Sequence, residues 1–252
     1  MNGSTNAKAS FGAIRGLVFI KIRELTTPFA LARSGAVFGI ALVLLGLLAW
    51  GSDDFSERYL GLIRGVFALT FLPIFCLTKG GETLRSEMKD GTIEYLWTRP
   101  VGKVELFFGF YLSSLLGCFA IIYPALLGIS LVGLIQGAIG VSSLLLLWVT
   151  VTAVVASFAA ISGAISSFTS KFVVFGIFYY SFVELGLGAI PNGVQRLAIS
   201  YHAEQLLYGL DGSSFLDGTA LGYILATGAL GLAVGASLFA KSKYVVGGEK
   251  ES

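Results

Sequence analysis

The sequence has little charge and few side chains that carry chemistry. Only 13% of its 252 residues are Asp, Glu, Lys or Arg, against roughly 25% in soluble domains, and its mean hydropathy is +0.83. It has one histidine and two cysteines. This scarcity excludes a water-soluble globule, a disordered chain and a disulfide-rich secreted scaffold. Cys76 and Cys118 fall inside apolar stretches, so we expect them to pack as small hydrophobic groups rather than to form a disulfide or bind a metal.

What the chain does have is long apolar runs. Backbone groups in hydrocarbon must be hydrogen-bonded within their own segment, so each run is predicted to be a helix about long enough to cross a bilayer. A barrel would instead alternate apolar and polar residues, and no such alternation is present. The sequence therefore predicts an all-α, multi-pass membrane protein with six transmembrane helices, and Pro124 is expected to kink the third. The predicted spans are residues 34–50, 60–78, 104–135, 141–168, 172–190 and 218–240.

The distribution of Lys and Arg predicts the orientation of these spans. Of the 17 basic residues, only Arg58, Arg64 and Arg196 fall on one predicted side or at a span end near it. The others lie before the first span, between the second and third, between the fourth and fifth, and after the sixth. Basic loops face the cytoplasm, so both termini are predicted to be cytoplasmic in a protein of the cell membrane.

Residues 11–31 show a helical stripe of apolar residues flanked by basic ones. Apolar side chains recur at steps of three and four from Phe11 to Phe29, with Arg15 and Lys21 beside them. This pattern is typical of an interfacial helix that lies on the membrane, and a frayed basic tail is the alternative. The apolar core between Arg15 and Lys21 is too short for a secretory signal. Pro28 is expected to end or bend the helix before the first span.

Most of the polar residues gather in one predicted cytoplasmic segment, residues 79–103. We expect the second span to continue as a helix to about Asp90, to turn at Gly91, and to be followed by a short helix that Thr92 caps and Arg99-Pro100 ends. That short helix carries apolar residues, including Trp97, beside charges. It can pack on a partner protein, on the membrane interface or under the protein's own helices.

The run EMKDGTIEYLWTRPV, residues 87–101, resembles the signature of the ABC type-2 transporter permease family. In that family the signature follows the second span, as it does here, and the six spans and the N-terminal amphipathic helix also agree. The resemblance implies that this loop is a coupling helix that docks in a groove of an ATP-binding subunit. The following residues match the signature position by position or lie within it: Glu87, Asp90, Gly91, Thr92, Glu94, Leu96, Arg99 and Pro100. Trp97 stands where a small aliphatic residue is more common.

The resemblance also implies the partners. No phosphate-binding loop of the form Gly-x-x-x-x-Gly-Lys-(Ser/Thr) occurs in the chain, so ATP and Mg are expected on a separate ABC ATPase subunit, with no cofactor and no catalytic residue here. A second copy of this chain, or a paralogue, is expected beside it, with membrane lipid around both and no nucleic acid. The whole chain, residues 1–252, is then one transmembrane domain, and export is favoured because the exterior segments are short.

Residues 191–217, between the fifth and sixth spans, are too apolar for a plain exterior loop. In the resembled family this connection forms short re-entrant or surface helices that cap the exit path, and an interfacial anchor is the alternative. His202 lies here without a second histidine or a nearby cysteine, so we expect a polar surface residue rather than a metal ligand.

Two charged residues fall within the spans, Arg64 in the second and Glu184 in the fifth. Charges at such positions are costly unless they are paired or reach water. An ion pair between them is one hypothesis, and separate extension to the outer surface is the other. Hydroxyl-bearing residues in the spans can line a path or bond neighbouring helices; they include Ser157, Ser162, Ser166, Tyr179 and Tyr180.

Two other functions compete with the permease. A secondary carrier or channel would show broken spans with paired charges or an inverted repeat, and no clear repeat is seen. A membrane-embedded enzyme would need a cluster of carboxylates or histidines, and the sequence shows none.

Overall fold

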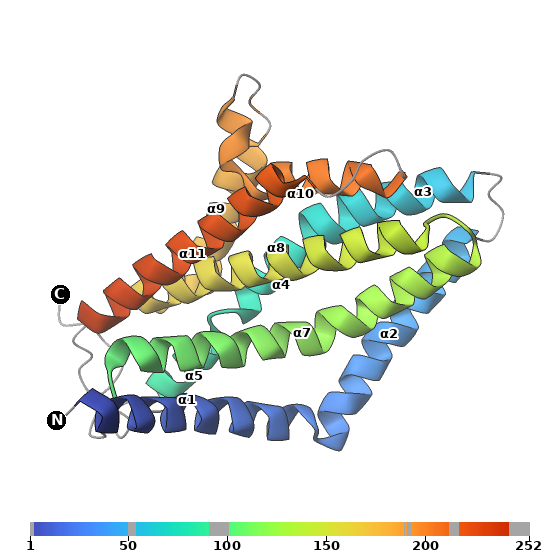
Figure 1. Ribbon diagram of the computed structural model, residues 1–252. Coiled ribbons are helices and arrows are strands. Elements are labelled where there is room, and N and C mark those ends of the chain that lie inside the picture. The colour runs from blue at the N-terminus through green and yellow to red at the C-terminus, as the bar shows by residue number, and fades with distance from the viewer. Residues whose placement is uncertain are drawn as a thin grey trace.

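The computed structural model describes residues 3–49, 54–90, 101–188, 190, 193–211 and 217–241. Within these ranges every regular element is a helix, which confirms the predicted all-α class. The helices form an elongated bundle, in which α1 and α7 begin and α11 ends at the same end (Figure 1). We call this the terminal end, and the opposite end, where α7 ends and α8 begins, the far end.

The elements follow one another along the chain with short connections. Two stretches, η1 and η2, are π-helical, and η3 and η4 are short 3₁₀ turns. The bounds are α1 Gly3–Leu25, α2 Pro28–Ala49, α3 Phe55–Gly61, η1 Leu62–Phe71, α4 Leu72–Lys79, α5 Glu82–Lys89, α7 Lys103–Ile135, α8 Val141–Phe168, α9 Phe172–Tyr179, η2 Tyr180–Leu187, η3 Val194–Leu197, α10 Ile199–Tyr208, η4 Gly209–Asp211 and α11 Gly218–Lys241.

Four rods within the described residues are long and apolar enough to cross a membrane: Phe55–Lys89, Lys103–Ile135, Val141–Phe168 and Gly218–Lys241. A fifth span is possible where Ile14–Leu25 and Pro28–Leu44 meet at a bend of 68°. The apolar rod Phe172–Leu187 is shorter than the others. The structure thus confirms a multi-pass protein with four or five candidate spans, and the count of six stays a prediction.

The N-terminal helix packs on the bundle. Glycines 109 and 117 of α7 face it: a Cβ at Gly109 would lie 2.8 Å from Leu17, and one at Gly117 would lie 3.4 Å from Lys21. As predicted, the chain bends before the first predicted span, and Pro28 is the first residue of α2. The structure places α1 along the first half of α7 (Figure 1), and the interfacial role of residues 11–31 stays a prediction.

The centre of the bundle is the contact between α8 and α11. Gly228, Gly231 and Gly235 of α11 lie so close to α8 that a Cβ at any of them would be within 3.3 Å of it or of Phe107. Ser157 on α8 donates a hydrogen bond of 2.8 Å to the carbonyl of Ile224 on α11. Small residues thus bring these two helices into close contact, as they commonly do between membrane helices.

Pro124 lies inside α7, and α7 runs on through it. A proline has no backbone N–H, so the carbonyl four residues earlier, that of Ala120, loses its helical donor. The hydroxyl of Ser34 on α2 donates a hydrogen bond of 2.7 Å to that carbonyl. One side chain therefore satisfies the orphaned backbone group and joins α2 to α7.

We predict that Ser34→Ala lowers the free energy of unfolding by about 1 kcal/mol, the typical worth of one hydrogen bond, because it leaves the Ala120 carbonyl without a donor. Denaturant unfolding of the purified protein in detergent measures this. Pro124→Ala restores the missing backbone donor, so Ser34→Ala should cost clearly less in that background. Equal costs in the two backgrounds would contradict the explanation.

Candidate functional site

The corner between α4 and α5 is packed tightly against α8. Gly80 and Gly81 form this corner, and a Cβ at either would lie within 2.9 Å of α8 atoms, from Ala159, Ser162 or Ser166. Ser162 also donates a hydrogen bond of 2.8 Å to the carbonyl of Leu77 on α4. The start of α5 is thus fixed to the bundle by both steric fit and a buried hydrogen bond.

Helix α5 is amphipathic and attached by its apolar face. Leu84 is buried in a small cluster with side chains of α7 and α11, including Phe107 and Phe239. Glu82 is exposed on the other face. The predicted helical extension of the second span to Asp90 is present, with the break at Gly80-Gly81, and Asp90 caps the end of α5.

The predicted coupling residues divide between described and undescribed parts of the chain. Glu87 lies on α5, is partly buried and has an interaction partner, and Asp90 is exposed. The remaining predicted contact residues lie outside the described residues, so their role stays a prediction: Gly91, Thr92, Glu94, Leu96, Trp97, Arg99 and Pro100. At the start of α7, the Glu105 carboxylate accepts a hydrogen bond of 3.0 Å from the backbone N–H of Gly102.

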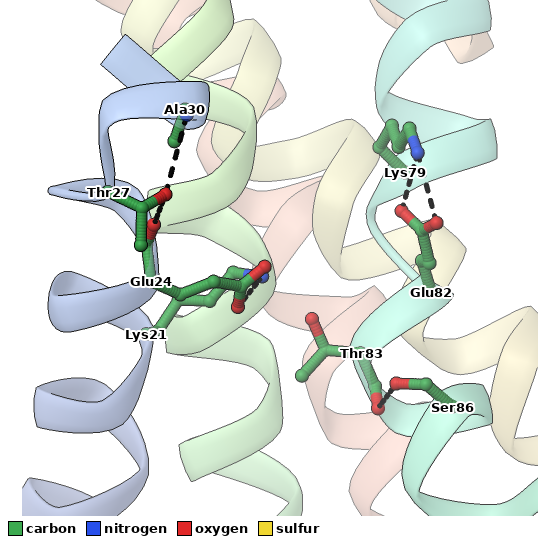
Figure 2. A network of polar contacts seen from close by, with 8 residues as sticks. All are labelled: Lys21, Glu24, Thr27, Ala30, Lys79, Glu82, Thr83 and Ser86. Atoms are coloured by element: carbon green, nitrogen blue, oxygen red, sulfur yellow. Dashed lines mark hydrogen bonds and ion pairs between the residues drawn. The ribbon is translucent and has the colours of Figure 1, made fainter.

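A polar cavity of about 380 Å³ lies between α1, the start of α2, the α4–α5 corner and α7. Figure 2 shows two ion pairs of this region, one within α1 and one across the α4–α5 corner. Lys21 Nζ lies 2.9 Å from a Glu24 carboxylate oxygen, and Lys79 Nζ lies 2.7 Å from one of Glu82. The other lining residues are Leu17, Ile20, Leu25, Arg33, Thr83, Ser86, Glu87, Ser113, Ser114, Gly117 and Ile121.

Two serines of α7 in the cavity wall have no hydrogen-bond partner among the residues that the structure describes. The side chains of Ser113 and Ser114 are 2% and 3% exposed, and neither hydroxyl is bonded. A hydroxyl on a helix can usually bond the carbonyl a turn earlier, so two neighbouring unbonded ones are unusual. Sequence patterns do not indicate this cavity, because its walls come from four separate segments.

The two charged residues within the predicted spans both contact α10. Glu184 is buried and accepts hydrogen bonds from the backbone N–H of Ser200, at 2.9 Å, from the Ser200 hydroxyl and from the Tyr179 hydroxyl. Arg64 donates to the carbonyls of Leu207 at 3.0 Å and Tyr208 at 3.4 Å. Its guanidinium lies 4.7 Å from the centre of the Tyr208 ring.

These contacts place an anion at the first turn of α10 and a cation at its last turn. A helix carries partial positive charge at its N-terminus and partial negative charge at its C-terminus, so both placements are favourable. The contacts described for Glu184 do not include Arg64, and α10 lies between the two residues; the ion pair and the separate extension to the outer surface both stay hypotheses. Both residues lie in the π-helical segments η1 and η2, a local geometry that often accompanies functional positions.

Residues 193–211 of the predicted exterior segment form short helices. Ile199, Leu206 and Leu207 of α10 are buried in the main core, as a re-entrant helix would be. His202 is buried too, against the expectation of a surface residue: its ring stacks on Tyr223 at 4.2 Å and its Nε2 lies 2.9 Å from the Arg196 carbonyl. Among the described residues no three His, Cys, Asp or Glu side chains gather in a way that could hold a metal ion.

The hydroxyl residues of the spans mostly bond the protein itself. Tyr180 donates to the Leu69 carbonyl at 2.8 Å, and Ser166 to the Gly163 carbonyl at 2.8 Å. Ser157, Ser162 and Tyr180 bond other elements and so hold helices together, whereas Ser166 bonds within α8. Cys76 and Cys118 are both buried free thiols in the main core, as predicted.

Comparison with known families supplies a match. A family model described as an ABC-2 family transporter protein matches residues 19–186, two thirds of the chain. The matched part runs from within α1 to within η2, and so contains all the cavity-lining residues except Leu17, the α4–α5 corner and the two charged residues that contact α10. No curated protein matches the chain.

We predict that Glu184→Ala speeds amide hydrogen exchange in Ile199–Tyr208 by about tenfold, because a partly buried charge at a helix end is worth about 1 to 2 kcal/mol. Hydrogen exchange with mass spectrometry on the detergent-solubilised protein measures this. Glu57→Ala, which removes an exposed carboxylate of α3, is the matched control and should leave α10 unchanged. Unaltered hydrogen exchange of α10 in the Glu184→Ala variant would refute a stabilising contact of Glu184 with the first turn of α10.

Exchanging the two charges separates the helix-end arrangement from a direct ion pair. Arg64→Glu combined with Glu184→Arg would put the wrong sign at each end of α10, so α10 should exchange faster than in either single variant. Recovery toward the wild-type rate would instead support a direct pair.

Proposed function

The chain belongs to the ABC-2 family of transporter proteins, and from this premise we propose that it is the permease of an ATP-driven exporter whose ATPase is a separate subunit. In this proposal ATP and Mg bind the partner, and this chain supplies the path and the surface that receives the motion. Two copies of this chain, or one copy and a paralogue, surround the path.

The observation that carries the proposal is the anchoring of α5 and α7, the helices on either side of residues 91–100. This segment follows α5 and leads into α7 after two further residues. Helix α5 is fixed by Leu84 and by the Gly80-Gly81 corner, and α7 contacts α1, α2, α8 and α11. Motion delivered to the end of α5 or the start of α7 would therefore reach the whole bundle through packed helices, as a coupling element requires.

The distribution of charge supports a cytoplasmic location for the terminal end. Lys89 ends α5, Lys103 begins α7 and Lys241 ends α11, while Arg58 lies on α3, toward the far end. Basic residues at the ends of membrane helices accumulate on the cytoplasmic side. We infer that both termini and residues 79–103 face the cytoplasm of a cell membrane, and that η3 and α10 lie toward the exterior.

Co-purification tests the proposal. The wild-type chain should bring down an ABC ATPase encoded beside its gene when both are expressed together, and Glu94→Ala with Trp97→Ala should reduce recovery at least tenfold. The loss of an apolar side chain at the centre of an interface commonly has such an effect. Glu57→Ala with Arg196→Ala, two exposed charges away from that segment, is the control and should bind normally.

Two results of this experiment would contradict the coupling role of residues 91–100. If crosslinking in the presence of a non-hydrolysable ATP analogue captures no ATPase with the wild-type chain, or if the loop variant and the control lose binding equally, the coupling role of residues 91–100 is wrong.

A further inference from the structure

We propose that the cavity between α1, α5 and α7 binds the phosphate headgroup of a membrane lipid, whose acyl chains leave along the apolar surface of α1. The site goes beyond the proposed function, because it requires neither an ATPase nor a transport cycle.

The charged residues that line the cavity balance in sign, with Lys21, Arg33 and Lys79 against Glu24, Glu82 and Glu87. Lys21 and Lys79 are neutralised by Glu24 and Glu82, and Glu87 already has a partner. Arg33 is exposed, lines the same cavity, and has no partner within the part of the chain that the structure describes. A guanidinium presents several donors that match phosphate oxygens in pairs. Arg33 is therefore the lining cation that a phosphate would bind.

The two unbonded serines supply further donors. Ser113 and Ser114 are buried, line the cavity and lack hydrogen-bond partners within the described part of the chain. Leaving a buried hydroxyl unbonded is costly, and a phosphate oxygen would accept from it. Serine donors on α7 and Arg33 on α2 face one space from two helices, as a headgroup site requires.

The apolar residues that line the rest of the cavity suit the apolar part of a lipid. Leu17, Leu25 and Ile121 line the cavity on the α1 and α7 sides. Ile20 lines it too, yet its side chain is 66% exposed, so the cavity opens beside this residue onto the surface. Phe19, equally exposed, continues that surface. Apolar side chains beside basic ones mark the depth at which lipid phosphates lie.

The volume also fits a headgroup. At about 380 Å³ the cavity is within the range of small-molecule sites, roughly 300 to 1,000 Å³. It could hold a phosphate and part of a glycerol unit, while the two acyl chains would have to remain outside. Free inorganic phosphate shares the headgroup chemistry but makes no use of the apolar mouth, so an experiment can separate the two sources.

Native mass spectrometry of the detergent-solubilised chain tests the site with dioleoyl phosphatidic acid. We expect saturable binding, weakened about tenfold or more by Arg33→Gln, the effect typical of a lost charged hydrogen bond. Arg23→Gln removes an exposed charge from α1 that does not line the cavity, and it should alter the affinity less than twofold.

Ser113→Ala with Ser114→Ala gives a second, independent readout. These hydroxyls bond nothing in the protein, so their loss should leave the unfolding temperature unchanged or raise it. The same variant should bind phosphatidic acid at least fivefold more weakly. A role confined to folding would not produce that combination.

Three outcomes would overturn the proposal. Equal binding of dioleoylglycerol, which has the same chains without phosphate, would show that the headgroup is not recognised. Displacement of the lipid by inorganic phosphate of equal affinity would make it a site for free phosphate. Equal weakening by Arg33→Gln and Arg23→Gln would show that only the overall charge attracts the lipid.

Discussion

A backbone carbonyl without a donor has no water to bond inside a membrane, and the bundle depends on how this constraint is met. Hydroxyls of one element bond carbonyls of another throughout the core. Ser34 bonds the carbonyl that Pro124 orphans, and Tyr59 donates to the Ile129 carbonyl at 2.8 Å. Tyr180 and Ser162 do the same between other elements. Each such bond fixes one helix against another, and that of Ser34 also satisfies an orphaned carbonyl, so polar side chains serve here as structural ties.

Much of the architecture could be predicted from the sequence, because long apolar runs permit only helices in hydrocarbon. Cys76 and Cys118 proved to be core residues, and the chain bends before Pro28, as local chemistry indicated. The number of spans was not settled in this way. The rod Phe172–Leu187 is short, and the pair of helices around Pro28 is bent by 68°, so hydropathy alone cannot say how either sits in a bilayer.

The partners of buried polar groups were less predictable. Arg64 and Glu184 were expected to meet or to reach water, whereas each contacts one end of α10. His202 was expected at the surface and is buried against Tyr223. Such pairings depend on segments far apart in the chain, and periodicity reports only which residues of one helix share a face. The cavity beside α1 could not be predicted from the sequence for the same reason.

Helix α10 has an anion bonded to its first turn and a cation bonded to its last, and the two charges belong to different rods. It therefore holds the two helical segments at a fixed separation through a polar contact at each of its ends. If the helical segment that contains Arg64 moves away from the one that contains Glu184, the polar contact at one end of α10 must break, because a helix cannot stretch. The freed charge would then have to find water, so separation is most favourable when that end of the bundle becomes wet. Hydration and opening would thus be a single cooperative event, and the dry, closed bundle would resist leakage between cycles.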